Sequence, residues 1–250
     1  MEYFTQRSTR RAAALSTAFP ESWRHVLESN SGHYRRLPRD LRAQFEKDVQ
    51  IFVTQRRITG IGIEASDELK LLVAASAVTL SLGSPGYDWD NLAEVLLYPE
   101  NFGRDYAFRV EEDQRAGEAH PWGTVILSVP TLRRSFEDPN DGYHVGIHEF
   151  AHLLDVDSTR FDGIPSWLND RQIGEWERLR DREMQRLARG DSILDEYGAH
   201  DPVEFMAVAI ENFFERPRAL RSGHAKLYQM LANYFRQDPA AWDDERLSEE

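Results

Sequence analysis

The chain has 250 residues, of which 41% are hydrophobic, enough for a substantial core in one large domain or two intimate subdomains. Its net charge of −13 argues against direct nucleic-acid binding, which depends on neutralising phosphates with Lys and Arg. It has no cysteine, which excludes disulfides and thiolate metal sites, so any metal must be held by His and carboxylate and we expect a cytoplasmic protein.

The first twenty residues look superficially like the start of a signal peptide, because arginines precede the small apolar run from Ala12 to Leu15. That run is too short, and no later segment approaches the ~20 apolar residues that a membrane helix needs. We therefore expect a flexible N-terminal arm over residues 1–20 and no association with a membrane.

Two helices and two strands are predicted in the first half of the chain. Residues 38–57 have the apolar spacing of an amphipathic helix, and residues 67–82 form a second, strongly apolar helix. Residues 58–64 between them are a glycine-broken connection with room for a short strand. Residues 93–98 and 125–129 have the apolar runs of buried strands.

The segment Tyr143–Asp155 contains the pattern His-Glu-x-x-His in an apolar sequence of helical period. Residues four apart lie on one face of a helix, so His148 and His152 can present imidazole nitrogens to one tetrahedral zinc ion. Glu149 can take a proton from water without occupying a coordination site. The pattern predicts a site for one Zn²⁺ per chain with the chemistry of a zinc peptidase.

Two residues beside this pattern each have two interpretations. His144 lies a further turn back on the same face, as an extra ligand or, as its polar neighbours favour, as a residue at the helix start. Asp155 either orients His152 through a hydrogen bond or begins the loop expected over residues 157–165.

The third protein ligand must come from a later helix, because the metzincin class requires Gly and His where Asp155 and Ser158 stand. The best later helix begins at Asp201, a good N-cap that proline follows. Glu204 and Glu211 lie on one face of it, and either can supply a carboxylate ligand. Alternatively, Glu204 is a capping partner of Asp201, and Glu211 is a surface charge near the end of the helix. Spacing alone leaves the choice open.

Packed helices are also predicted on either side of this one, over residues 169–189 and 225–235, each with an apolar stripe. The acidic residues that end the chain are expected to be mobile. The predicted fold class is α+β, mostly helical with a small sheet beside the motif helix. We expect the cleft between the motif helix and the helix of Glu204.

The segments Ile147–Asp155 and Tyr197–Phe205 resemble the glucose-regulated metallopeptidase family of Mlc titration factor A, and the spacing of Tyr197 and Glu204 resembles the catalytic domain of anthrax lethal factor. The resemblance implies a zincin-like metallopeptidase in which Glu204 is the third zinc ligand and Tyr197 faces the zinc-bound oxygen. The resemblance extends over about residues 20–240, and with the composition of the two ends it leads us to expect the following division: an arm over 1–20, one domain over 21–240 with subdomains over about 21–135 and 136–240, and a tail over 241–250.

We therefore predict a zinc-dependent peptidase, with aminopeptidase and endopeptidase action both open. His148, His152 and Glu204 hold the ion and leave one coordination position free. Glu149 is the general base, and the Tyr197 hydroxyl stabilises the oxyanion together with zinc.

The expected substrate is a peptide or protein. In zinc peptidases of this kind the strand before the motif usually borders the cleft, so an extended substrate could pair with the edge of residues 125–129. The alternative is that this strand is an ordinary internal one.

The competing function is a non-catalytic binding protein that has a structural zinc site and sequesters a regulator. The resemblance supports it, because the family's namesake binds the glucose repressor Mlc and relieves repression of sugar-uptake genes. A structural site is normally closed by four protein ligands, whereas Glu149 and an open position are typical of a catalytic one. We therefore favour an enzyme, with a transcriptional repressor of the Mlc type as a further partner.

Overall fold

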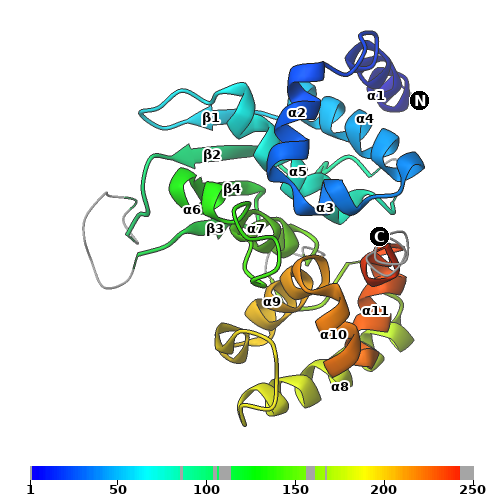
Figure 1. The fold of residues 1–250 in the computed structure, drawn as a ribbon, viewed down its shortest axis with the longest axis vertical. Helices are drawn as coiled ribbons and strands as arrows, with labels where there is room; N and C mark the ends of the chain where they lie inside the picture. The colour runs from blue at the N-terminus through cyan, green and yellow to red at the C-terminus, as the bar shows by residue number, and fades with distance from the viewer. Residues whose placement is uncertain are drawn as a thin grey trace.

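The computed structural model describes residues 2–84, 87–103, 106, 114–155, 161–166 and 168–242, with side chains from residue 8 onwards. The described chain is mostly helical with one small mixed sheet, which confirms the predicted α+β class (Figure 1). Residues 243–250 of the expected tail and residues 157–160 of the expected loop lie outside the described residues.

Four short strands form the sheet. They are β1 (Ile58–Gly60), β2 (Glu94–Tyr98), β3 (Gly117–Ala119) and β4 (Thr124–Ser128). Their order is β1-β2-β4-β3; the first three in this order are parallel, and β3 pairs antiparallel with β4. The strand before the motif, β4, is therefore internal, which was the alternative interpretation of residues 125–129. The edge belongs to β3, which we did not predict because three residues of mixed polarity give no period-2 signal.

The N-terminal helices are α1 (Glu2–Ala14), α2 (Glu21–Asn30), α3 (Gly32–Arg36), α4 (Arg39–Gln55) and α5 (Asp67–Ser81). Nearly all of α5 is buried, because its sequence is apolar on every side. The Ser66 side chain caps α5 by accepting a hydrogen bond from the Leu69 N–H at 3.3 Å. A helix, α1, stands where we expected a flexible arm, and Arg11 ties it to Asp88 through an ion pair of 2.6 Å.

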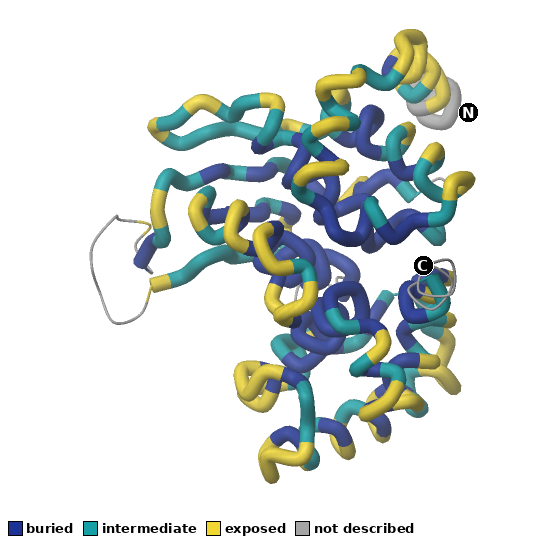
Figure 2. The backbone as a smooth tube through the Cα atoms, viewed as in Figure 1, coloured by how far each residue is buried: buried dark blue, intermediate teal, exposed yellow. Residues whose placement is uncertain are grey.

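The C-terminal half contains α6 (Val129–Arg134), α7 (Val145–Leu153), α8 (Asp170–Leu187), the short 3₁₀-helix η1 (Glu196–Ala199), α9 (Pro202–Glu215), α10 (Pro217–Gly223) and α11 (Ala225–Phe235). The helix with the zinc pattern, α7, lies against α9, and both are almost entirely buried (Figure 2). Asp201 begins α9, because its carboxylate accepts the N–H groups of Val203 and Glu204. Within the described residues, no helix combines the length and the apolar character that crossing a membrane requires.

Candidate metal site and cleft

His144 sets where α7 begins and is not part of the ligand group. Its Nδ1 accepts a hydrogen bond of 3.2 Å from the Ile147 N–H, which makes it the N-cap. Burial lowers the pKa of His144 to about 3, so the ring stays neutral and can accept this bond. The structure therefore shows His144 as a residue at the helix start and not as an extra ligand.

His148 and His152 lie on one face of α7, with their ring centroids 4.8 Å apart. Glu204 approaches them from the first turn of α9. Its Oε2 lies 3.0 Å from His148 Nε2 and 3.8 Å from His152 Nε2. The ligand atoms of these three residues all lie within 4.8 Å of one another, and no other His, Asp and Glu group in the described chain gathers in this way. Two imidazole nitrogens and one carboxylate oxygen are a donor set that suits a zinc ion.

The histidines differ in charge. Burial and the charge of His148 lower the pKa of His152 to about 3, so its ring is neutral and one of its nitrogens has a lone pair to donate. Its Nδ1 has no hydrogen-bond partner among the described residues. Burial opposes a charge on His148 as well, but the carboxylates of Glu211 and Glu204 outweigh it and raise the pKa of His148 well above its usual value. These carboxylates therefore favour a positive charge at His148. A metal cation bound to Nε2 in place of its proton would also supply that charge.

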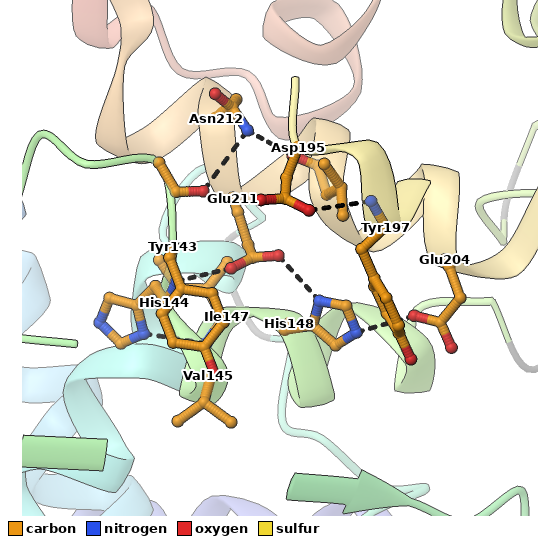
Figure 3. A network of polar contacts seen from close by, with 12 residues as sticks. Tyr143, His144, Val145, Ile147, His148, Asp195, Tyr197, Glu204, Glu211 and Asn212 are labelled. Carbon is orange, nitrogen blue, oxygen red and sulfur yellow. Dashed lines mark hydrogen bonds and ion pairs between the residues drawn. The ribbon is translucent and has the colours of Figure 1, made fainter. Parts of the chain in front are cut away.

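Glu211, the second carboxylate of α9, contacts the His148 ring at Nδ1, the nitrogen that does not face Glu204 (Figure 3). Its Oε1 accepts a hydrogen bond of 2.8 Å from His148 Nδ1, and its Oε2 accepts the His144 N–H at 2.5 Å. With Nδ1 as the donor, His148 directs its Nε2 towards Glu204. This is the usual arrangement of a carboxylate that orients a metal-ligating imidazole. Spacing left Glu204 and Glu211 as equal candidates, and the structure places Glu204 beside both imidazoles.

Glu149 points from α7 towards β3. A Cβ atom placed on Gly117 would lie 2.5 Å from Glu149 Oε1 and 2.7 Å from its Cγ, so the carboxylate rests directly on the backbone of the strand. Burial raises the pKa of Glu149 to about 8; the charge of His148 lowers it, while the neighbouring carboxylates raise it. Such a carboxyl group can both take up and release a proton near neutral pH.

Tyr197 projects from η1 beside the ligand atoms (Figure 3). Its side chain is 47% exposed, and its ring centroid lies 6.1 Å from that of His148. Partial burial and the charges of Glu204 and Glu149 raise the pKa of Tyr197 to about 12, so the hydroxyl keeps its proton and can donate a hydrogen bond.

A cleft of about 610 Å³ opens over these residues, and β3, α7, η1 and α9 form its walls. The edge strand β3 lies along this cleft. The Ala116 carbonyl and the His120 N–H bond to β4, so by the antiparallel alternation the polar groups of Gly117 and Ala119 point the other way. Both residues line the cleft. Apolar side chains complete its walls: Val145, Phe161, Val203 and Val208.

Asp155 does not reach His152. Its carboxylate accepts the N–H groups of Asp162 and Gly163, at 3.0 and 2.8 Å, and so holds the loop that follows the motif helix. Gly117 and Asn212 are site residues that sequence reasoning missed. Asn212 donates to the Gly142 carbonyl at 3.4 Å and so fixes the start of the motif segment. An amide within the apolar run of α9 was the available signal for it.

The chain is similar to known proteins over most of its length. The model of the family described as glucose-regulated metallo-peptidase M90 matches residues 4–236. An uncharacterized protein of Synechocystis is 31% identical over 236 residues, which cover 88% of this chain and 85% of that protein. Proteins named Mlc titration factor A from Salmonella gallinarum and Salmonella arizonae are 30% identical over 206 and 207 residues; these cover 76% of this chain and 76% and 80% of the two relatives.

Proposed function

We propose that this chain, which belongs to the glucose-regulated metallopeptidase family, is a zinc-dependent peptidase with a zincin-like active site. Its membership of the family confirms the resemblance found in the sequence. The observation that carries the proposal is the convergence of the ligand atoms of His148, His152 and Glu204 at the floor of a cleft. The family implies a metal ion, and this donor set favours zinc. When bound, zinc supplies a Lewis acid that polarises the substrate carbonyl and acidifies water.

We propose that Glu149 and Tyr197, beside the ligands, carry out peptide hydrolysis. Glu149 takes a proton from the attacking water as the water oxygen bonds to the carbonyl carbon. It then gives that proton to the amine nitrogen as the C–N bond breaks, so one water yields a carboxylic acid and an amine. The Tyr197 hydroxyl donates a hydrogen bond to the carbonyl oxygen as its negative charge develops.

The substrate that we propose is an extended peptide or an unfolded segment of a protein. The main-chain groups of Gly117 and Ala119 point away from β4 and both residues line the cleft, so they can pair with a substrate segment as a fifth strand of the sheet. Pairing of this kind uses the backbone, so it leaves the choice of side chain to the apolar walls. The edge is that of β3, whereas the sequence had suggested residues 125–129.

A second function is favoured by the names of the Salmonella relatives, which are titration factors of Mlc. We propose that this chain also binds a transcriptional repressor of that type in the cytoplasm. A purely structural zinc site is the poorer account of the cleft, because only three ligand side chains converge within the described residues and the side facing the cleft remains open to substrate.

Chelation followed by metal return tests the peptidase proposal. The wild-type protein and Glu149→Gln are stripped of metal, reloaded with one zinc per chain, and assayed on aminoacyl reporters and on an unfolded protein. We expect hydrolysis by the zinc-loaded wild type and a loss of at least about 100-fold in Glu149→Gln at full zinc content. Equal hydrolysis by the two proteins would contradict the proposal, and the preferred substrate separates aminopeptidase from endopeptidase action.

A further inference from the structure

Residues 191–195, which we name the strap, join the end of α8 to η1 and form part of the cleft wall through Asp195. They have no regular secondary structure, so their main-chain groups need partners elsewhere. The strap leads directly to Tyr197. The Asp195 carboxylate accepts a hydrogen bond of 2.8 Å from the Tyr197 N–H. This bond connects the end of the strap to the backbone of η1.

Two arginines hold the carbonyl groups of Asp191 and Ile193 in the strap. Arg186 of α8 donates from Nη2 to the Asp191 carbonyl at 3.1 Å. Arg216, at the junction of α9 and α10, donates from Nη1 to the Ile193 carbonyl at 3.1 Å. Hydrogen bonds from a charged group are stronger than neutral ones, so these two contacts fix the path of the chain.

His224, at the junction of α10 and α11, holds the middle of the strap. Its Nε2 lies 3.3 Å from Ser192 Oγ and 3.4 Å from the Ile193 nitrogen. An N–H group only donates, so Nε2 must carry a lone pair and the proton must sit on Nδ1. Nδ1 lies 2.7 Å from the Glu183 carboxylate, which accepts its proton, and 3.1 Å from Arg186 Nη1, which also pairs with that carboxylate. Both His224 and Glu183 are buried, at 2% and 4% exposure, so the arrangement is built into the core.

The Tyr197 side chain depends on this support. Its ring is half exposed, and no hydrogen bond joins its hydroxyl to a described residue. Its position over His148 and Glu204 therefore follows from the backbone of the strap and η1. We infer that His224, Arg186 and Arg216 are positioning residues for the Tyr197 hydroxyl, an inference that rests on the proposed peptidase function. They act on the reaction by setting where the oxyanion donor stands, since a displacement of about 1 Å can cost on the order of 100-fold in rate.

The test compares Arg216→Met and Ser192→Ala with the control Arg189→Met, each with and without Tyr197→Phe. Both test residues are only partly buried, so their variants are expected to fold, and the Arg189 side chain makes no hydrogen bond or ion pair with the described chain. We expect Arg216→Met to lower kcat about 10-fold at unchanged KM and zinc content, with a smaller loss for Ser192→Ala and none for the control. In the Tyr197→Phe background neither substitution should lower kcat further, because the hydroxyl that they position is absent.

A second readout does not depend on activity. Hydrogen exchange of residues 191–198, followed by mass spectrometry, should be about 10-fold faster in Arg216→Met, because one charge-assisted hydrogen bond is lost. Exchange should be unchanged in Arg189→Met. Unchanged exchange in Arg216→Met, or a loss of kcat that multiplies with that of Tyr197→Phe, would overturn the inference. If the wild type hydrolyses no peptide, the proposed function fails, and exchange alone then decides whether these residues hold the Tyr197 segment.

Discussion

Gly117→Ala tests the placement of the general base with the smallest change that the chain allows. The added methyl group would lie 2.5 Å from Glu149 Oε1, 2.7 Å from Cγ and 2.8 Å from Cδ. Carbon and oxygen atoms prefer about 3.5 Å, so the carboxylate must move by about 1 Å. A side chain can move this far at little cost in stability, but a catalytic group misplaced by that distance loses on the order of 100-fold in rate. We therefore expect kcat to fall about 100-fold while zinc content and Tm change little.

The assay measures kcat on the best peptide substrate, zinc per chain and the thermal midpoint for Gly117→Ala and for Gly174→Ala. The control replaces a glycine of α8 where the nearest atom to an added Cβ is the end of the Arg178 side chain, at 3.3 Å. It should keep full activity and gain slightly in stability, as alanine does inside a helix. Full activity in Gly117→Ala would refute the contact between Glu149 and β3.

Three further predictions address other parts of the site and the core. Glu204→Gln should weaken zinc binding strongly because an amide is a poor ligand, whereas Glu211→Gln should retain the metal with about 10–100-fold lower affinity or activity; chelator competition that shows the reverse order would mean that the ligand is misassigned. Tyr197→Phe should lower kcat at unchanged KM and zinc content, and an unaltered kcat would leave the hydroxyl without a catalytic role. Burial raises the pKa of Glu215 from 4.5 to about 9, so the folded state keeps a proton that the unfolded chain releases, and stability should fall between these pH values by up to about 1.4 kcal/mol per pH unit. Glu215→Gln should remove this dependence of stability on pH. The measurement is the free energy of unfolding by urea at about pH 5 and pH 8, and an equal change between the two pH values in both proteins would contradict the prediction.

The sequence predicted those parts of the fold whose signal is local. The helices α4, α5, α8, α9 and α11 were predicted within two residues of their observed bounds, because apolar spacing and caps such as Asp201 are written in consecutive residues. The pairing of His148 and His152 is also local, since a helix alone places them on one face. The family resemblance then pointed to Glu204, which spacing alone did not separate from Glu211.

What the sequence did not predict depends on contacts between distant segments. β3 becomes a strand only because β4 pairs with it, and Gly117 has meaning only where Glu149 rests on it. The contact of Glu211 with the imidazole of His148 joins residues 63 positions apart. Residues 2–14 are mostly polar, and they form a helix in the structure, where Arg11 pairs with Asp88.

The most direct test of the central claim is anomalous X-ray diffraction at the zinc edge from crystals of the zinc-loaded protein. We expect one peak per chain, bonded at about 2.0–2.2 Å to Nε2 of His148 and His152 and to a carboxylate oxygen of Glu204. The side of the ion that faces Tyr197 and the cleft should carry no protein ligand. A peak elsewhere in the chain, no peak at one zinc per chain, or a fourth protein ligand closing the site would contradict the proposed peptidase centre.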